Sequence, residues 1–124
     1  MSHRVLVVED NGALRFALRV MLEVEPYVER IETVPSGEHA LRIAPELKPD
    51  VVVTDSGLPG LSGEEVAAKI RSVVPEARII SFSGNDRITP WADERITKGR
   101  PTAIEDLRAA VSRGPRRNAA VASR

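Results

Sequence analysis

The sequence predicts an α/β fold in which helices cover both faces of a parallel sheet. Short runs of β-branched and aliphatic residues alternate along the chain with segments of helical periodicity. These runs are too uniformly apolar to have a solvated face, which is typical of strands buried within a parallel sheet. Right-handed crossovers leave only a few doubly wound topologies, whose functional residues gather at the carboxyl ends of the strands.

The first strand is expected over residues 4–8, where an aliphatic run is bounded by charged residues. A helix follows it, and Asn11 is a suitable N-cap. The apolar residues of this helix recur at the spacing of one helical face: Leu14, Leu18, Met21 and Leu22. Residues 28–34 form the second expected strand.

The second helix is expected to begin after Ser36, and Pro45 should kink it or end it early. A third strand over 51–54, a third helix over 64–73 and a fourth strand over 78–82 follow. The second helix carries Ala40, Leu41, Ala44 and Leu47 on its apolar face.

A short fifth strand is expected over residues 94–97 and a last helix over 102–111. The apolar side of this helix consists of Ile104, Leu107, Ala110 and Val111. The length of 124 residues fits one domain.

Acidic and polar side chains follow the expected strands: Glu9 and Asp10, then Asp55, Ser83 and Lys98. Converging carboxylates repel each other by about 4 kcal/mol per pair at about 4 Å and an effective dielectric constant near 20. Mg²⁺ would relieve this repulsion, since its ligands are oxygen atoms. Asp55 precedes an open Gly-Leu-Pro-Gly loop, so we expect it to act as a nucleophile toward phosphorus. Glu9 and Asp10 would hold the metal, while Ser83 and Lys98 would hold an anionic oxygen.

Four motifs in order, LVVEDN, TDSGLPGLSG, IISFSG and ITKG, resemble the receiver domain of two-component response regulators. The resemblance covers residues 4–113 and implies a flavodoxin-like fold, with five parallel strands in the order 2-1-3-4-5. It also implies a signalling protein that catalyses only its own phosphorylation and dephosphorylation.

Carried over residue by residue, the resemblance implies that Asp55 accepts a phosphoryl group from a histidine kinase or a histidine phosphotransfer protein. Ser83 would donate a hydrogen bond to the phosphoryl group and Lys98 would pair with it. A phosphorylation-dependent change in binding to a downstream protein would follow. The implied Mg²⁺ ligands are Asp10, Glu9 through water, Asp55 and the backbone carbonyl of Gly57.

The chain departs from the family pattern between the fourth and fifth strands. Arg95 replaces an expected aromatic residue, and Gly99 replaces the proline expected after the lysine. Only 14 residues separate Ser83 from Lys98, too few for a full helix with its loops. We therefore expect the fourth helix of the family to be shortened or missing, with at most two turns over 90–93 after Thr89.

Two other functions are open. The first is a receiver-like protein-interaction module that does not use phosphate, because the switching elements are altered. The second, a hydrolase with an aspartyl-phosphate intermediate, is disfavoured because Gly57 occupies the position of its second acid.

A receiver domain is expected over 1–112 and a basic tail over 113–124, with no output domain. The tail holds four arginines and no acid, whereas the other 112 residues carry 14 basic and 18 acidic side chains. We expect a solvated tail and neither nucleic acid nor a membrane as a partner. The short apolar runs and the absence of cysteine favour a cytoplasmic location. We expect His3 and His39 on the surface and Trp91 in packing.

Overall fold

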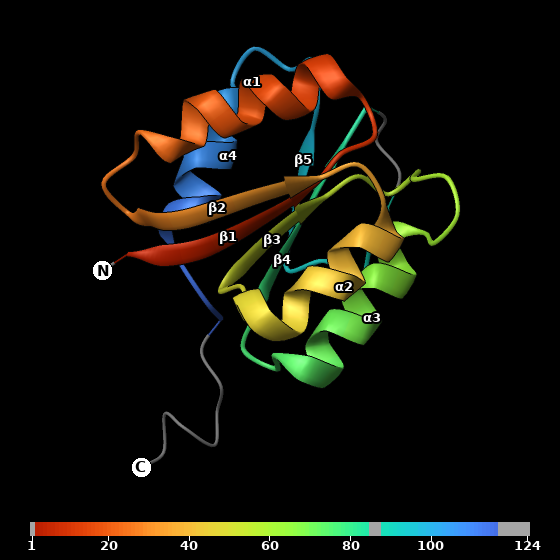
Figure 1. Ribbon diagram of the computed structural model, residues 1–124. Coiled ribbons are helices and arrows are strands. Elements are labelled where there is room, and N and C mark those ends of the chain that lie inside the picture. Colours follow the sequence, from red (N-terminus) through yellow and green to blue (C-terminus); the bar gives the residue numbers. More distant parts are fainter. Residues whose placement is uncertain (1, 85–87, 117–124) are drawn as a thin grey trace.

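The computed structural model describes residues 2–84 and 88–116. Its five parallel strands lie in the order β2-β1-β3-β4-β5, which confirms the predicted fold class (Figure 1). None of the helices in this part of the chain is both long and apolar enough to cross a membrane. In chain order the elements are β1 (His3–Val8), α1 (Gly12–Glu23), β2 (Val28–Val34), α2 (Gly37–Leu47), β3 (Val51–Thr54), α3 (Gly63–Val73), β4 (Arg78–Ser83), β5 (Glu94–Thr97) and α4 (Ala103–Ser112).

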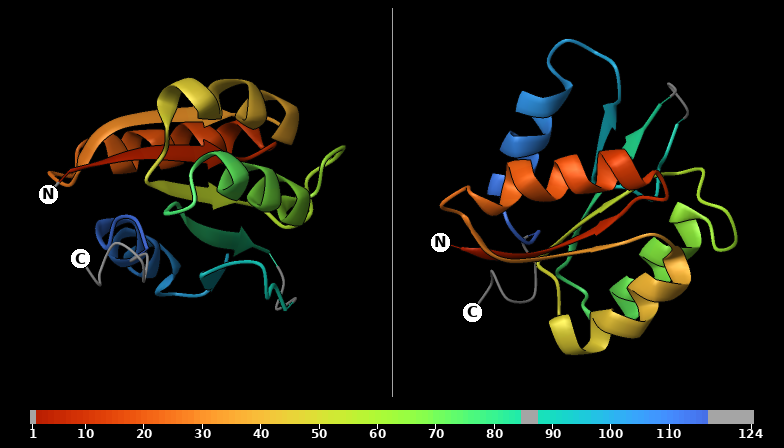
Figure 2. Two further views of the ribbon diagram at one scale, coloured as in Figure 1. Left: turned by 90° about the horizontal axis from the view of Figure 1, so that it is seen from below. Right: turned by 45° about the horizontal axis from the view of Figure 1, so that its top comes forward.

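The helices cover the two faces of the sheet in pairs. Helices α1 and α4 lie on one face and α2 and α3 on the other, and both views in Figure 2 keep α4 apart from α2 and α3. Alternate residues of each strand enter opposite cores: Val5 and Val7 pack toward α1 and α4, and Leu6 and Val8 toward α2 and α3. Because both faces are covered, the inner strands β1, β3 and β4 are almost wholly buried, whereas the edge strands β2 and β5 carry exposed polar residues.

The helix starts follow the sequence closely. Asn11 Oδ1 accepts the N–H of Leu14 at 2.9 Å, as a helix N-cap does. Helix α2 continues through Pro45 and ends two residues later at Leu47, where Lys48 adopts a left-handed conformation with φ of 50°. Pro45 therefore lies in the last turn.

No helix forms between β4 and β5 in the described residues 84 and 88–93, so the shortened or missing fourth helix is confirmed. Thr89 does not cap a helix. It is buried, and its hydroxyl lies 2.9 Å from that of Ser81 on β4. Trp91, as expected, packs against the core on the α2 and α3 face. The last predicted helix of the sequence is thus α4.

The prediction that His3 is a surface residue is wrong, whereas His39 is exposed. The ring of His3 is 6% exposed, and its Nε2 lies 3.2 Å from the carbonyl oxygen of Ser112. The cause is the end of α4, which lies over the start of β1. Gly114, with φ of 70°, brings its backbone against the ring where a Cβ would clash.

The first residues of the expected tail pack on the domain. Arg116 donates its backbone N–H to Glu76 O at 2.8 Å, and Arg78 donates to Gly114 O at 2.7 Å. The rest of the expected tail, 117–124, lies outside the described residues. The boundary at residue 112 therefore stays a prediction.

Candidate functional site at the carboxyl ends of the strands

The charged residues of the site follow two inner strands and one edge strand of the sheet. Glu9 follows β1, Asp55 follows β3 and Lys98 follows β5. Because these strands are parallel, their carboxyl ends lie at one rim of the sheet. The structure thus brings together residues that are up to 89 positions apart in the chain.

Lys98 joins two of the carboxylates. Its Nζ donates to Glu9 Oε1 and to Asp55 Oδ2, both at 2.7 Å. The backbone N–H of Lys98 donates to Ser83 O at 2.7 Å, and the ammonium lies 5.6 Å from the ring centroid of Phe82. These contacts of the backbone N–H and of the ammonium hold the lysine over the rim.

The ammonium of Lys98 is held in its charged form. Burial alone would lower the pKa of Lys98, but hydrogen bonds from the ammonium to Asp55 and Glu9 and the charges of these two acids outweigh burial. The pKa of Lys98 is therefore raised above its ordinary value. At neutral pH the Lys98 ammonium is therefore a fixed positive charge in the site.

Glu9 is buried, and several groups hold it in place. Its Oε2 accepts the backbone N–H of Asn11 at 3.1 Å, and its Oε1 accepts from Lys98. Arg15, from the first turn of α1, donates to the Glu9 backbone carbonyl at 2.9 Å. Glu9 is 2% exposed, and the ammonium and the N–H give each of its carboxylate oxygens a hydrogen-bond partner.

Asp55 is less enclosed than Glu9. Its Oδ1 accepts the backbone N–H of Gly57 at 2.8 Å, and its carboxylate is half-buried at the mouth of the loop after β3. Asp10 is exposed, and no residue in the described part of the chain pairs with it. Among the described residues, the rim therefore carries three carboxylates and the ammonium of Lys98.

This donor set fits Mg²⁺. One carboxylate oxygen from each of Glu9, Asp10 and Asp55 lies within 4.8 Å of the others. Hard oxygen ligands with open sides suit Mg²⁺, which keeps several waters and binds phosphate oxygens as well. The three acids would hold the ion, with the Gly57 carbonyl as a further expected ligand.

Ser83, at the end of β4, contacts a residue that the sequence did not single out. Its Oγ accepts the backbone N–H of Ser56 at 3.1 Å and lies 2.7 Å from the Ser56 hydroxyl. Ser83 is 2% exposed. Nothing in the sequence distinguishes Ser56 beyond its place directly after Asp55, because the contact depends on how β3 and β4 end side by side.

The loop after Asp55 is fixed by two glycines and one acid. Glu38 on α2 accepts the N–H of Leu61 at 3.0 Å, and this hydrogen bond lowers the pKa of Glu38. Gly60, with φ of 76°, passes the Glu38 carboxylate so closely that a Cβ would clash. A Cβ on Gly63 would lie 2.5 Å from the carbonyl oxygen of Asp55 and 2.9 Å from the Trp91 ring. The loop therefore holds Asp55 in one place.

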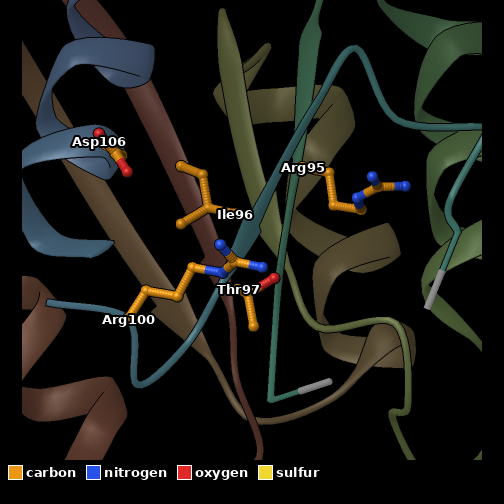
Figure 3. Close-up of a pocket in the computed structure, with 5 residues that line it drawn as sticks. All are labelled: Arg95, Ile96, Thr97, Arg100 and Asp106. Carbon is orange, nitrogen blue, oxygen red and sulfur yellow. The ribbon is translucent and has the colours of Figure 1, made fainter. Parts of the chain in front are cut away.

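A hollow of about 300 Å³ crosses the edge strand β5. Figure 3 shows the side chain of Ile96 pointing toward α4 and that of Arg95 pointing away from it. Arg95 is exposed on the face that the absent helix would cover. Because residue 95 is an arginine, this position has no aromatic ring that could rotate toward Ser83, as expected from the sequence.

The fold and the rim define a class of protein, and comparison with known families agrees. The family model for the response regulator receiver domain matches residues 5–100. The chain belongs to this family, whose members act in two-component signalling, bind Mg²⁺ at an acidic pocket and interact with histidine kinases and downstream effectors. Receiver domains are generally signalling domains rather than enzymes.

Individual relatives support this assignment. The transcription regulator BvgA of Bordetella pertussis is 39% identical over 84 residues, which are 68% of this chain and 40% of BvgA. The regulatory protein KdpE of Mycobacterium tuberculosis is 36% identical over 124 residues, 95% of this chain and 53% of KdpE. The chain thus spans about half or less of these two relatives.

A solved structure shares both the fold and 33% of the sequence. It is the response regulator TrrA of Thermotoga maritima in complex with Mg²⁺ and BeF, with a TM-score of 0.76. The match covers 91% of this chain and 98% of TrrA.

Proposed function

We propose that Asp55 accepts a phosphoryl group from a histidine kinase or a histidine phosphotransfer protein, and that this changes the binding of a downstream protein. The observation that supports it best is the charge of the described rim, where the Lys98 ammonium pairs with Glu9 and Asp55 while the nearby Asp10 has no described partner. Asp55 is the acid of the rim that combines partial exposure with a direct contact to Lys98. An incoming phosphoryl group can reach it from the loop side.

The chain's own residues would each take one part of the transfer. A carboxylate oxygen of Asp55 attacks phosphorus while the bond from phosphorus to the donor nitrogen or oxygen breaks, and the donor leaves with that electron pair. Lys98 would follow the charge onto the phosphoryl oxygens, and Ser83 would donate a hydrogen bond to one of them. Glu9, Asp10, Asp55 and the Gly57 carbonyl would hold Mg²⁺, which neutralises charge on the transferring group.

The direct test is phosphorylation by acetyl phosphate with Mg²⁺, measured by intact mass spectrometry. We expect a mass gain of one phosphate in the wild type and none in Asp55→Asn. Asp106→Asn is the matched control, because Asp106 is an exposed acid on α4 bonded to Thr102. It should be phosphorylated like the wild type.

One alternative function has specific support. The helix between β4 and β5 is absent from the described residues, and Arg95 stands where an aromatic residue is expected. A phosphate-independent interaction module would retain the fold without the transfer. If acetyl phosphate adds no mass to the wild type, and a phosphorylated histidine kinase transfers nothing to it either, this alternative replaces the proposal. A cytoplasmic, free-standing protein stays a prediction from the sequence.

A further inference from the structure

Ser56 has a contact in the site to which the receiver motifs assign no role. It follows Asp55 directly and is half-buried. Its backbone N–H and its hydroxyl both reach the same atom, Ser83 Oγ, at 3.1 and 2.7 Å. Two contacts from one residue thus fix the oxygen that is expected to serve the phosphoryl group.

The chemistry of a hydroxyl limits how this contact can work. A serine hydroxyl has one hydrogen to donate and two lone pairs to accept with. The Ser56 N–H occupies one lone pair of Ser83 Oγ. The bond between the two hydroxyls can run in either direction, because either oxygen can be the donor.

A phosphoryl group on Asp55 would decide that direction. Its oxygens carry most of two negative charges near neutral pH and act as acceptors. Ser83 can donate to them only if its hydrogen no longer points to Ser56. Ser56 must then donate into the second lone pair of Ser83, which reverses the hydroxyl bond but keeps the 2.7 Å contact.

We propose that Ser56 is a positioning residue for the phosphorylated site: its hydroxyl donates to Ser83, and Ser83 donates to the phosphoryl group on Asp55. This inference rests on the proposed function of Asp55 and Ser83. Reversing the bond between the two hydroxyls needs no change in the 2.7 Å distance between their oxygens, so Ser56 can hold Ser83 in either direction of the bond. Two donors into one oxygen also polarise the Ser83 hydroxyl and strengthen the bond that it donates.

A double-mutant cycle tests this role with beryllofluoride and Mg²⁺ as the phosphoryl mimic. Binding is measured by ¹⁹F NMR, which detects the bound fluorides directly. Losing the Ser56 hydroxyl in Ser56→Ala should weaken binding on the order of 2- to 12-fold, the value of one net hydrogen bond. It should also shift the resonance of the fluoride beside Ser83. Ser56→Thr keeps the hydroxyl and should restore both.

The cycle separates a role through Ser83 from an independent one. Ser83→Ala should weaken binding at least as much, and adding Ser56→Ala to it should cause no further loss. Ser72→Ala, which removes an exposed hydroxyl bonded to Lys69 O, is the matched control and should bind like the wild type. Where Ser56→Ala fails to fold, Ser56→Cys keeps the size, loses the strong donor and should give the same loss.

Three results would overturn the inference. Equal or tighter binding in Ser56→Ala would mean that Ser56 is idle or restrains Ser83 instead. An equal loss in the presence and absence of Ser83 would mean that Ser56 acts independently. If the wild type itself binds no beryllofluoride, the phosphoacceptor role of Asp55 falls first and the role of Ser56 falls with it.

Discussion

A charged cluster lies at each end of β5: in the described residues, acids outnumber their paired cations at one end, and arginines outnumber acids at the other. At its carboxyl end lies the acid rim, Glu9, Asp10 and Asp55, with Lys98 as the paired cation. At its amino end, Asp93 and Glu94 meet four guanidinium groups. The arginine cluster consists of Arg71 and Arg116 beside Asp93, and Arg78 and Arg113 beside Glu94.

The two clusters differ in their ratio of acidic to basic groups, and this difference corresponds to different roles. Each acid of the arginine cluster already has two cations, so this end needs nothing from solution and ties α3, α4 and residue 116 to the sheet. In the described part of the acid rim, the three carboxylates have one directly paired ammonium, and a divalent metal ion can supply the missing positive charge. One strand thus carries a structural cluster at its start and a binding cluster at its end.

The largest expected effect comes from breaking the arginine cluster at Asp93. Asp93 Oδ2 accepts the backbone N–H of Ile79 at 2.8 Å and a guanidinium N–H of Arg71 at 2.7 Å. Asp93→Ala leaves the N–H of a fully buried residue without its acceptor, which costs about 1–3 kcal/mol, and adds the loss of the ion pair. We expect urea unfolding to show a loss of about 2–4 kcal/mol.

Asp106→Ala is the control for this loss. Asp106 accepts from the Thr102 hydroxyl on the exposed side of α4, so its removal should change the free energy of unfolding by no more than about 0.5 kcal/mol. If Asp93→Ala and Asp106→Ala lowered the free energy of unfolding by similar amounts, the arginine cluster would not stabilise the fold as expected.

Magnesium should act on the acid rim alone. At a free concentration tenfold above its Kd, Mg²⁺ should raise the free energy of unfolding by about 1.4 kcal/mol. Asp10→Asn removes an expected ligand that no described residue pairs with. Stability without metal should therefore stay unchanged, while most of the stabilisation by Mg²⁺ should disappear. Asp93→Ala should keep the increment. An undiminished increment in Asp10→Asn would exclude Asp10 as a ligand.

The sequence predicted the acid rim better than the arginine cluster for a physical reason. Glu9 and Asp55 stand directly after apolar strands and Lys98 directly after the short strand β5, and parallel strands place such residues at one edge. The arginines come from α3, from β4 and from beyond α4, so no single period or motif connects them. Their meeting depends on helix packing, which a single sequence does not reveal.

The same limit explains the error at His3 and the omission of Ser56. His3 is polar and near the terminus, and it is buried because the end of α4 folds back over it. Ser56 matters through the lateral approach of β3 and β4. The missing helix, in contrast, was predictable from length, since 14 residues between Ser83 and Lys98 cannot hold a full helix and its loops.

A smaller effect of opposite sign should follow from neutralising Asp55. In the free protein Lys98 bonds both Asp55 and Glu9, while Asp55 also lies close to the carboxylates of Glu9 and Asp10. Asp55→Asn removes the repulsion from these two acids and leaves the lysine its bond to Glu9. We expect no loss of stability without Mg²⁺ and a gain of up to about 1 kcal/mol, as is common where a site is strained for function.

Asp93→Asn makes the matched change at the other end of β5. It removes a charge that pairs with Arg71 and Arg116, and should therefore lower stability. Urea unfolding of both variants at low salt measures the difference. A loss above about 1 kcal/mol in Asp55→Asn would mean that the rim is as neutralised as the arginine cluster.

The smallest effect is the pH dependence contributed by Lys98. Since its folded pKa is raised above the ordinary value of about 10.4, its stabilisation is fully present below that pH and is lost as the pH rises through the folded pKa. Tyr27 acts in the same window and with the same sign, because burial and then Glu25 raise its pKa too.

The two contributions separate in a Tyr27→Phe background. This change should cost little, since the buried Tyr27 hydroxyl has no hydrogen-bond partner among the described residues. The background protein should still lose stability in urea as the pH rises above about 10, and Lys98→Arg added to it should flatten the loss, because a guanidinium stays charged there. If Lys98→Arg left the fall of the unfolding free energy with pH unchanged, the loss of stability at alkaline pH would come from groups other than Lys98.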